Sequence, residues 1–351
     1  MAKYLIIRLS AMGDVAMLLP ALYAVARANP QHGFTLLTQP FLTSLLVNPP
    51  ANLEAMAIDI RREERSVWGL LRYAERLRKE RFDYLIDLHS VLRTWLLGLA
   101  SCVWSPTRWY RLRKPRAARR RLLYANPREL RAVPPMLNLY VQTLRRSGLD
   151  LPADIPPISL GEMSTFHQEV LDPYFASEAS EILRLGIAPF ASVEAKTYDL
   201  VQMQELVGQL SATGRYRIYL FGGRSEAKEL EIWAARYGAI SLAGRFGLHD
   251  ELYAMSLLDL MLSMDSANAH LASMIGIPVL SIWCATHPAA GFMPLGQSEE
   301  SCLQPDEMPC RPCSIFGKVG RCVLGDMPCR RALPPTVIAE RIDALSASLR
   351  R

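Results

Sequence analysis

The chain has 351 residues, of which 50% are hydrophobic and 21% are charged. This length exceeds one ordinary core and fits two domains, and the hydrophobic content excludes a disordered chain. The 24 prolines and 20 glycines are spread along the sequence, which excludes a long coiled coil, and the net charge of +6 is mild enough that its distribution matters more than its sum.

Three features bear on the cellular compartment. No apolar run approaches the roughly 20 residues that are needed to cross a bilayer. The apolar stretch 15–26 has a basic residue before it, as in a secretory signal, but Arg8 and Asp14 disfavour that interpretation. The seven cysteines are odd in number and gather toward the end of the chain, unlike a secreted disulfide framework. We therefore expect a protein of the reducing cytoplasm.

Strands and helices are expected to alternate along the chain. In the first half, the pattern predicts strands at 4–7, 34–38 and 84–87 and helices at 15–28 and 91–102. In the second half, it predicts strands at 185–189, 217–221, 259–264 and 279–283 and helices at 200–210, 225–237, 268–275 and 334–349. This alternation is typical of parallel sheets flanked by helices.

The expected fold class is therefore α/β, with two doubly wound halves that face a cleft. Prolines at 152, 156 and 157 mark a break between the halves. We expect an N-terminal domain at 1–155, a C-terminal domain at 156–333, and a final helix at 334–351 that packs back on the N-terminal domain. Ligands bind beyond the carboxyl ends of the strands in such sheets.

The segment 8–14 joins the first strand to the first helix and ends in Asp14. The structural interpretation is that Asp14 caps the helix, where exposed amides favour a carboxylate. The functional interpretation is a general base that points into the cleft. Gly13 permits a sharp turn beside it, and the segment is neither a dinucleotide fingerprint nor a Walker A loop.

Polar residues also follow strands in the second half. The block Asp265–His270 lies between a strand and a helix, and Lys196 and the pair Gly222-Gly223 follow two other strands. Asp265 could cap its helix, and a lone histidine such as His270 is more commonly a core residue. Free amides at a helix start suit phosphates and sugar hydroxyls, and three such strand ends together favour a nucleotide site.

These segments resemble the lipopolysaccharide heptosyltransferase family, glycosyltransferase family 9, over nearly the whole chain. The resemblance is carried by Arg8-Leu9-Ser10-x-x-Gly13-Asp14-Val15 with Leu19-Pro20-Ala21, Tyr84-Leu85-Ile86-Asp87-Leu88 with Arg93, Leu242-Ala243-Gly244, Asp265-Ser266 to His270-Leu271-Ala272 with Gly276-x-Pro278, and Thr286-His287-Pro288. It implies a GT-B fold of two Rossmann-like domains and an inverting transfer from a nucleotide sugar, usually ADP-heptose.

The resemblance also implies roles for single residues. Asp14 would be the base that deprotonates the acceptor hydroxyl. Donor-binding residues would be Ser192, Lys196, Glu226, Asp265, Ser266 and His270. Acceptor-binding residues would include Ser10, Gly13 and Arg93. Outside the resemblance, Lys196 and Glu226 have the alternative interpretation of solvated surface charges.

Two departures touch the expected donor pocket. Ala267 stands where the family has glycine, and Ala191 replaces a hydroxyl residue. They leave the identity of the sugar open and give an inactive protein as an alternative. No D-x-D motif occurs in the chain, so we expect no metal to take part in catalysis and no cofactor to be required.

A basic stretch without any acidic residue lies between Asp87 and Glu129. Its charges are Arg93, Arg108, Arg111, Arg113, Lys114, Arg116, Arg119, Arg120, Arg121 and Arg128, and Trp104, Trp109, Tyr110 and Tyr124 are interleaved. We expect this stretch, with Arg119, Arg120 and Arg121 at its centre, to bind an anionic glycolipid at a membrane surface. The alternatives are a solvated loop and a nucleic-acid-binding surface. The sequence contains no recognisable nucleic-acid-binding fold that would support the second alternative.

Four cysteines near the end, Cys310, Cys313, Cys322 and Cys329, have a spacing compatible with a structural zinc site. Reduced cysteines without metal are the alternative. We expect an inverting glycosyltransferase that transfers heptose from ADP-heptose to the anionic lipid A–Kdo or core of lipopolysaccharide, peripheral on the cytoplasmic face of the inner membrane, without a nucleic-acid partner. Another donor or acceptor, or a zinc-stabilised nucleic-acid-binding protein, is the alternative.

Overall fold

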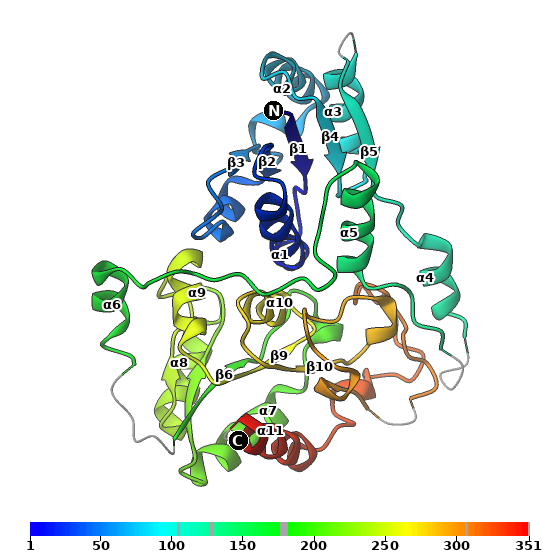
Figure 1. Ribbon diagram of the computed structural model, residues 1–351. Helices are drawn as coiled ribbons and strands as arrows, with labels where there is room; N and C mark the ends of the chain where they lie inside the picture. Colours follow the sequence, from blue (N-terminus) through cyan, green and yellow to red (C-terminus); the bar gives the residue numbers. More distant parts are fainter. Residues whose placement is uncertain (104–105, 126–129, 176–181, 306–307, 350–351) are drawn as a thin grey trace. The chain divides into compact units, whose positions relative to one another are not determined.

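The computed structural model describes residues 1–103, 106–125, 130–175, 182–305 and 308–349. Contacts divide the chain into two compact units, one formed by Met1–Pro115 with Pro134–Ser159 and the other by Arg116–Val133 with Leu160–Arg351. Each unit has one sheet flanked by helices, so the expected α/β class is confirmed (Figure 1).

The first unit is built on a five-stranded parallel sheet in the order β3-β2-β1-β4-β5. Its elements are β1 (Lys3–Ile7), α1 (Met12–Ala28), β2 (Gly33–Thr38), η1 (Pro40–Leu45), β3 (Leu53–Ala57), η2 (Glu63–Arg65), α2 (Val67–Lys79), β4 (Tyr84–Asp87), α3 (Leu92–Cys102), β5 (Arg108–Arg111) and α5 (Met136–Arg146). The central strand β1 is an apolar run that is buried after its first residue, as expected for a sheet covered on both faces.

The second unit has a six-stranded parallel sheet in the order β11-β10-β9-β6-β7-β8. Its elements are α4 (Arg116–Leu122), α6 (Thr165–Leu171), β6 (Leu183–Ala188), η4 (Glu194–Lys196), α7 (Leu200–Ala212), β7 (Tyr216–Leu220), α8 (Ala227–Tyr237), β8 (Ile240–Ser241), α9 (Leu248–Ser256), β9 (Leu260–Met264), α10 (Ala267–Met274), β10 (Val279–Ile282), η5 (Pro288–Ala290), η6 (Glu299–Ser301), β11 (Cys302–Leu303), η7 (Pro328–Arg330) and α11 (Pro335–Leu349).

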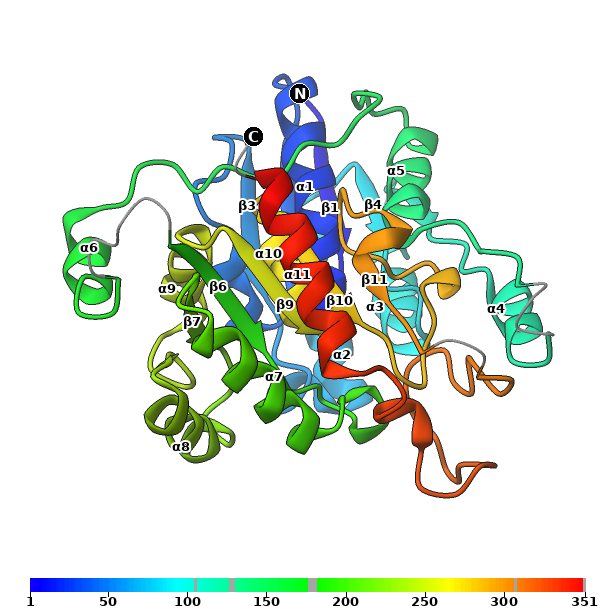
Figure 2. The same ribbon diagram turned by 90° about the horizontal axis from the view of Figure 1, so that it is seen from below.

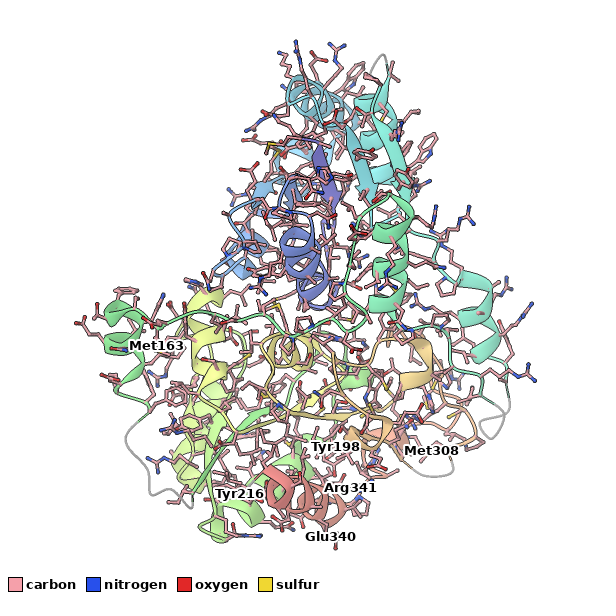
Figure 3. All side chains as sticks on the ribbon, viewed as in Figure 1. Met163, Tyr198, Tyr216, Met308, Glu340 and Arg341 are labelled. Atoms are coloured by element: carbon pink, nitrogen blue, oxygen red, sulfur yellow. The ribbon has the colours of Figure 1, made fainter. Side chains whose placement is uncertain are left out.

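The final helix α11 packs against α7 (Figure 2). Ile338 and Ile342 are fully buried in the core of the second unit. The hydroxyl of Tyr216 donates to Asp343 at 2.5 Å, and that of Tyr198 donates to the carbonyl of Leu333 just before the helix. Figure 3 labels these two tyrosines. These contacts place α11 in the second unit. Its packing on the N-terminal domain stays a prediction.

The segment 116–133 differs from the expected division, because its contacts group it with the second unit rather than with 1–155. Leu122 and Val133 pack with Ala289 and Ala290 in a small apolar cluster of that unit. The backbone amide of Val133 donates to the carbonyl of Ala289 at 2.9 Å. Within the described ranges, none of the helices combines the length and the apolar character that are required to cross a membrane.

Candidate functional site

In the first unit, the sheet order reverses between β1 and β4. These strands are parallel neighbours with Ile7 opposite Asp87, so the loops that follow them leave the sheet side by side. Such a switch point is where open α/β sheets bind ligands. A cavity of about 520 Å³ lies there, and Ser10, His89 and Arg93 are among the residues that line it. The structure therefore brings together two of the residues that were predicted to bind the acceptor, Ser10 and Arg93.

Asp14 lies in the first turn of α1, next to the buried Gly13. Its Oδ2 accepts a hydrogen bond from the backbone amide of Ala11 at 3.2 Å. Ala11 is the N-cap residue and Asp14 is the third residue of the helix, so the interpretation of Asp14 as the N-cap is wrong. Oδ2 of Asp14 also pairs with the guanidinium of Arg8 at 2.5 Å. These two contacts fix the carboxylate just beyond the carboxyl end of β1.

Arg8 is itself buried, with 4% of its surface exposed. It donates to the carbonyl of Leu88 at 2.8 Å and lies over the ring of Tyr140. Burial by itself lowers the pKa of Arg8, but Tyr140 and Asp14 raise it above its ordinary value. The guanidinium therefore stays charged and joins the loops after β1 and β4.

His89 is a site residue that the sequence analysis did not single out. It follows β4, and the buried carboxylate of Asp87 accepts from the backbone amides of His89 at 3.0 Å and Ser90 at 2.7 Å. Burial, with the nearby charge of Arg8, lowers the pKa of His89 to about 3. The imidazole in this cavity is therefore neutral. The available signal was its place two residues after a predicted strand end.

In the second unit, the reversal lies between β6 and β9, with Ala188 opposite Ser263. Lys196 follows β6, and its Nζ pairs with Oδ2 of Asp265 at 2.8 Å. Asp265 follows β9 and is 6% exposed. The structure thus joins two of the predicted donor-binding residues at the position where the fold places a ligand.

Thr286 completes this arrangement and was quoted only as part of the family resemblance. Its hydroxyl is fully buried and donates to Oδ2 of Asp265 at 2.8 Å. Ser266 precedes α10, and its hydroxyl lies 3.1 Å from that of Ser263. His270 is buried one turn into the same helix. The first turn of α10 therefore presents backbone amides beside the Lys196–Asp265 pair.

Two other predicted donor-binding residues, Glu226 and Ser192, are not part of the contacts described for Lys196 and Asp265. Oε2 of Glu226 accepts from the backbone amide of Gly223 at 2.6 Å, in the turn after β7. A side chain at Gly222 would come within 2.8 Å of that oxygen, so the glycine gives Glu226 its room. Ser192 is exposed in the loop between β6 and η4.

The basic stretch divides by burial. Arg119 is 6% exposed, donates to the carbonyl of Ala290 at 3.0 Å and lies 4.3 Å from the ring centre of Phe292. It is therefore a packing residue rather than a free acceptor-binding charge, because its guanidinium is enclosed by the unit. Arg120 and Arg121 are exposed as expected. Trp104 and Arg128 lie outside the described residues.

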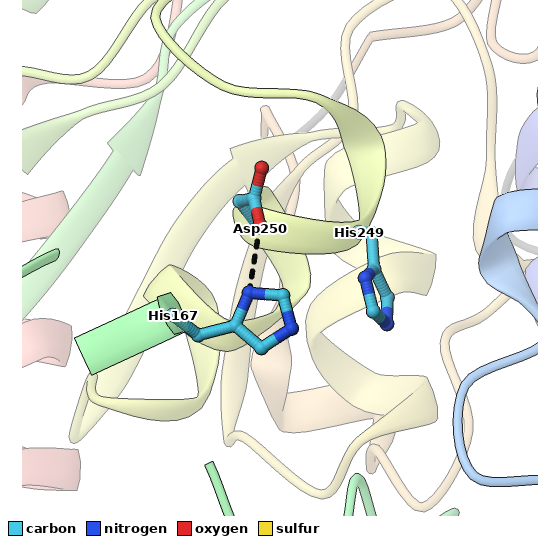
Figure 4. A group of neighbouring side chains, drawn as sticks. All are labelled: His167, His249 and Asp250. Carbon is cyan, nitrogen blue, oxygen red and sulfur yellow. Dashed lines mark hydrogen bonds and ion pairs between the residues drawn. The ribbon is translucent and has the colours of Figure 1, made fainter. Parts of the chain in front are cut away.

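A cluster of His167, His249 and Asp250 joins α6 to α9 (Figure 4). One ligand atom from each lies within 4.8 Å of the others, and two imidazoles with a carboxylate can hold a divalent transition metal. Nδ1 of His167 lies 2.9 Å from Asp250 Oδ1, and its ring stacks on Tyr253. This hydrogen bond and the stacking explain the cluster without an ion.

Each of the two parallel sheets reverses its strand order once, which is the architecture of two Rossmann-like domains. Over 98% of this chain and 97% of the other, the structure is similar to the glycosyl transferase family 9 protein from Veillonella parvula, with a TM-score of 0.75 at 17% identity. It is also similar to the ADP-heptose LPS heptosyltransferase II of E. coli, with a TM-score of 0.67 at 19% identity over 99% of this chain and 100% of the other. The expected fold is confirmed.

The model of glycosyltransferase family 9 (heptosyltransferase) matches residues 70–318, and the chain belongs to this family. Among curated proteins, lipopolysaccharide heptosyltransferase 1 of Pseudomonas aeruginosa is 24% identical over 89% of this chain and 86% of the relative. The prediction of a glycosyltransferase is confirmed, and the alternative of a nucleic-acid-binding protein is not supported.

Proposed function

We propose that this chain transfers heptose, with inversion, from ADP-heptose to an anionic lipopolysaccharide core acceptor. The observation that carries the proposal is the meeting of Lys196 and Asp265 beyond β6 and β9, beside the first turn of α10. The relative from Pseudomonas aeruginosa has the name lipopolysaccharide heptosyltransferase 1, which supports a lipopolysaccharide acceptor. A solved E. coli relative, heptosyltransferase WaaC, was determined with ADP and with ADP-2-deoxy-2-fluoro heptose.

The leaving group of this reaction is a nucleoside diphosphate, whose negative charge grows as the bond to the sugar breaks. Lys196 supplies a cation, and the amides that open α10 supply aligned dipoles. Asp265 holds the ammonium of Lys196 at 2.8 Å and is itself held by Thr286. Lys196 is thereby held beyond the strand ends, and its ammonium is proposed to contact the departing phosphate. Ser192, Glu226, Ser266 and His270 are proposed to complete the donor site, as the family resemblance implies.

Asp14 is the proposed general base. In an inverting transfer, the base accepts the proton of the acceptor hydroxyl while that oxygen attacks the anomeric carbon from the face opposite the leaving group. The cavity lined by Ser10 and Arg93 lies at the same strand ends and is proposed for the acceptor, with Gly13 in the turn beside it. Arg65 and Arg93 give this cavity positive charge that suits carboxylates and phosphates.

Attachment to the inner membrane is also proposed, on the cytoplasmic side. One face of α3 exposes Leu92, Trp95 and Leu99, which recur at helical spacing. Leu92 also lines the cavity that contains Arg65 and Arg93. An apolar and aromatic helix face with adjacent arginines suits the boundary of an anionic bilayer. The exposed Arg120 and Arg121 are proposed to add to this attraction.

The base is tested with Asp14→Asn, which keeps an acceptor for the amide of Ala11. We expect transfer to slow by about 10² to 10⁴-fold, while ADP still raises the melting temperature as in the wild type. Transfer at the wild-type rate would refute the base. Lys196→Met is expected to weaken ADP binding by about tenfold or more, with Lys196→Arg as the charge-retaining control.

A panel of ADP-heptose, UDP-sugars and GDP-sugars, scored by thermal shift and by release of the nucleotide, tests the donor. We expect a response to ADP-heptose above the others. A larger response to a UDP- or GDP-sugar would favour the alternative of another donor, which the alanines at 191 and 267 leave open.

A further inference from the structure

We propose that the cavity beyond β1 and β4 binds an amphiphile, so that its apolar wall holds an acyl chain of the acceptor while its arginines hold the anionic groups to which that chain is joined. The inference rests on the proposed function, which assigns the cavity to a lipopolysaccharide acceptor without saying which part of the acceptor enters it. It adds a subsite for hydrocarbon to the polar subsite of Ser10 and Arg93.

The lining of the cavity is largely apolar. Seven of the residues that line it are leucine, isoleucine or valine, and the four polar ones are Ser10, Arg65, His89 and Arg93. Sugar hydroxyls and phosphates would lose water against such a wall without gaining a hydrogen bond, whereas a hydrocarbon chain is stabilised by leaving water. The volume of about 520 Å³ is typical of sites that enclose a small molecule. The lining therefore indicates a ligand that is partly apolar.

The apolar wall is built by the first turns of α2 and α3, two helices that pack against each other. Val67 and Leu70 come from α2, and Leu92 and Leu96 come from α3. Leu70 is buried, whereas Val67 and Leu92, the first residues of their helices, are exposed. The cavity therefore opens to solvent where the two helices begin.

Apolar side chains continue from this opening along both helices. The exposed residues of this surface, here called the helix-pair face, recur at helical spacing and are Val67, Trp68 and Leu71 on α2 and Leu92, Trp95 and Leu99 on α3. The α3 part of the face is the surface that is proposed to meet the bilayer. A hydrocarbon chain at the bilayer boundary therefore has an apolar path into the cavity.

The charge beside the opening determines which occupant the site suits. Seven basic and three acidic residues lie between 61 and 79, and α3 adds Arg93 without any acidic residue. Two copies of this chain that met through the helix-pair face would bring like charges together, which disfavours a second copy as the occupant. An anionic lipid has the complementary charge.

Two of these charges line the cavity itself. In the part of the chain that the structure describes, neither Arg65 nor Arg93 forms an ion pair with a carboxylate. A guanidinium binds a phosphate or a carboxylate through a planar fork of N–H donors. The cavity thus combines free cations with an apolar wall, which is the arrangement that an anionic head group joined to an acyl chain requires.

Local hydrogen bonds fix the backbone on both sides of the opening. The hydroxyl of Ser66 accepts from the amide of Gly69 at 3.0 Å and caps α2. At the start of α3, the hydroxyl of Thr94 donates to the buried Asp87 at 2.9 Å and accepts from the amide of Val91 at 3.1 Å. A wall whose backbone is already ordered loses little conformational entropy when a chain binds.

The subsite is tested with straight-chain carboxylates, which combine one anionic group with a chain of chosen length. Binding of hexanoate, octanoate and decanoate to the full chain is measured by calorimetry at concentrations below micelle formation. We expect the affinity to rise by about threefold to fourfold for each added methylene, because each one leaves water for the apolar wall. An affinity that does not depend on chain length would overturn the subsite.

Substitutions locate the bound chain. Leu96→Gln is expected to weaken decanoate binding by about tenfold, because an amide replaces hydrocarbon in the wall. Leu92→Gln should also weaken it, at an exposed position where the fold is not at risk. Leu71→Gln is the matched control, since Leu71 is exposed on the helix-pair face but does not line the cavity. Equal weakening by Leu71→Gln and Leu96→Gln would assign the chain to the exposed face and overturn the subsite.

The source of the chain is tested by transfer from ADP-heptose to a lipopolysaccharide acceptor with its acyl chains and to the same acceptor after their removal by alkali. We expect the acylated acceptor to have a KM lower by about tenfold, and this ratio to fall in Leu96→Gln but not in Leu71→Gln. Equal KM values in the wild type would overturn the assignment of the chain to the acceptor. Decanoate binding without transfer to either acceptor would refute the proposed function and support the subsite.

Discussion

The arginines of the basic helix α4 differ in their surroundings. Arg119 is enclosed by Ala290 and Phe292, whereas Arg120 and Arg121 are exposed. We expect Arg119→Ala to lower the free energy of unfolding by about 2–3 kcal/mol, because a desolvated cation–π contact and a buried hydrogen bond are both lost.

Arg120→Ala and Arg121→Ala are the matched controls, and each is expected to change stability by less than about 0.5 kcal/mol. Chemical denaturation measures the free energy of unfolding of all three variants, which are compared at the same dependence of this free energy on denaturant concentration. If the three variants had equal midpoints, the packing role of Arg119 would be refuted. In the proposed function, Arg120→Ala and Arg121→Ala are instead expected to raise the acceptor KM and to leave ADP binding unchanged.

The sequence could not distinguish Arg119 from its neighbours. Three consecutive arginines look alike, and the carbonyl that accepts from Arg119 is 171 positions away. His89 and Thr286 were likewise not picked out as site residues, because their roles come from burial and from contacts across the fold. Asp14, Lys196 and Asp265 were identified because each follows a strand of a recognisable pattern. Their placement at the strand ends was therefore predictable, and the Lys196–Asp265 ion pair was not.

At the scale of elements, the buried central strands and the longer helices were predicted from their apolar patterns. Strand β4 is the apolar run Tyr84–Asp87, but its neighbour β5 reads Arg-Trp-Tyr-Arg and was not predicted. It forms because its residues pair in register with β4, Leu85 opposite Trp109. Edge strands depend on such tertiary pairing, so local sequence identifies them poorly.

The exposed face of α3 gives a prediction at this scale. Leu92→Ser/Trp95→Ser should weaken binding to vesicles that contain anionic phosphatidylglycerol by about tenfold, because apolar surface no longer enters the bilayer boundary. Val201→Ser is the control, since Val201 is an apolar residue that is 75% exposed on another helix, α7. Sedimentation with vesicles measures the binding. Equal binding by the double variant and the wild type would exclude α3 as the membrane surface.

At the scale of the whole molecule, each unit repeats the same plan. A parallel sheet reverses its strand order once, and the loops beyond that point carry the polar residues of the proposed site. The net charge of +6 is small, but the acid-free stretch after Asp87 concentrates arginines in one part of the chain. The two sheets explain the length of the chain, and one sheet is proposed for each substrate. The acid-free stretch explains where the positive charge lies.

The stability of the whole chain is expected to respond to pH through buried groups whose pKa shifts oppose one another, His89 and His287 on one side and Glu251 on the other. Burial lowers the pKa of His89 to about 3 and raises that of Glu251 to about 7. Below pH 6.5, the unfolded chain protonates His89 and the folded chain does not, so acidification to pH 5 lowers the free energy of unfolding by about 2 kcal/mol. Over the same interval, the folded chain protonates Glu251 before the unfolded chain does, which raises the free energy of unfolding by a similar amount.

His89 and Glu251 can be separated by substitution. In His89→Gln, the free energy of unfolding should rise by about 2 kcal/mol between pH 7 and pH 5 relative to the wild type, because the destabilising histidine is gone. In Glu251→Gln, it should fall by about 2 kcal/mol over the same range, because the stabilising protonation of Glu251 is gone. Denaturation at the two pH values gives, for each variant, the difference from the wild-type change, and differences of the same sign would contradict the opposing pKa shifts. His249 and His287, whose pKa values are also lowered by burial, remain in both variants and cancel when each variant is compared with the wild type.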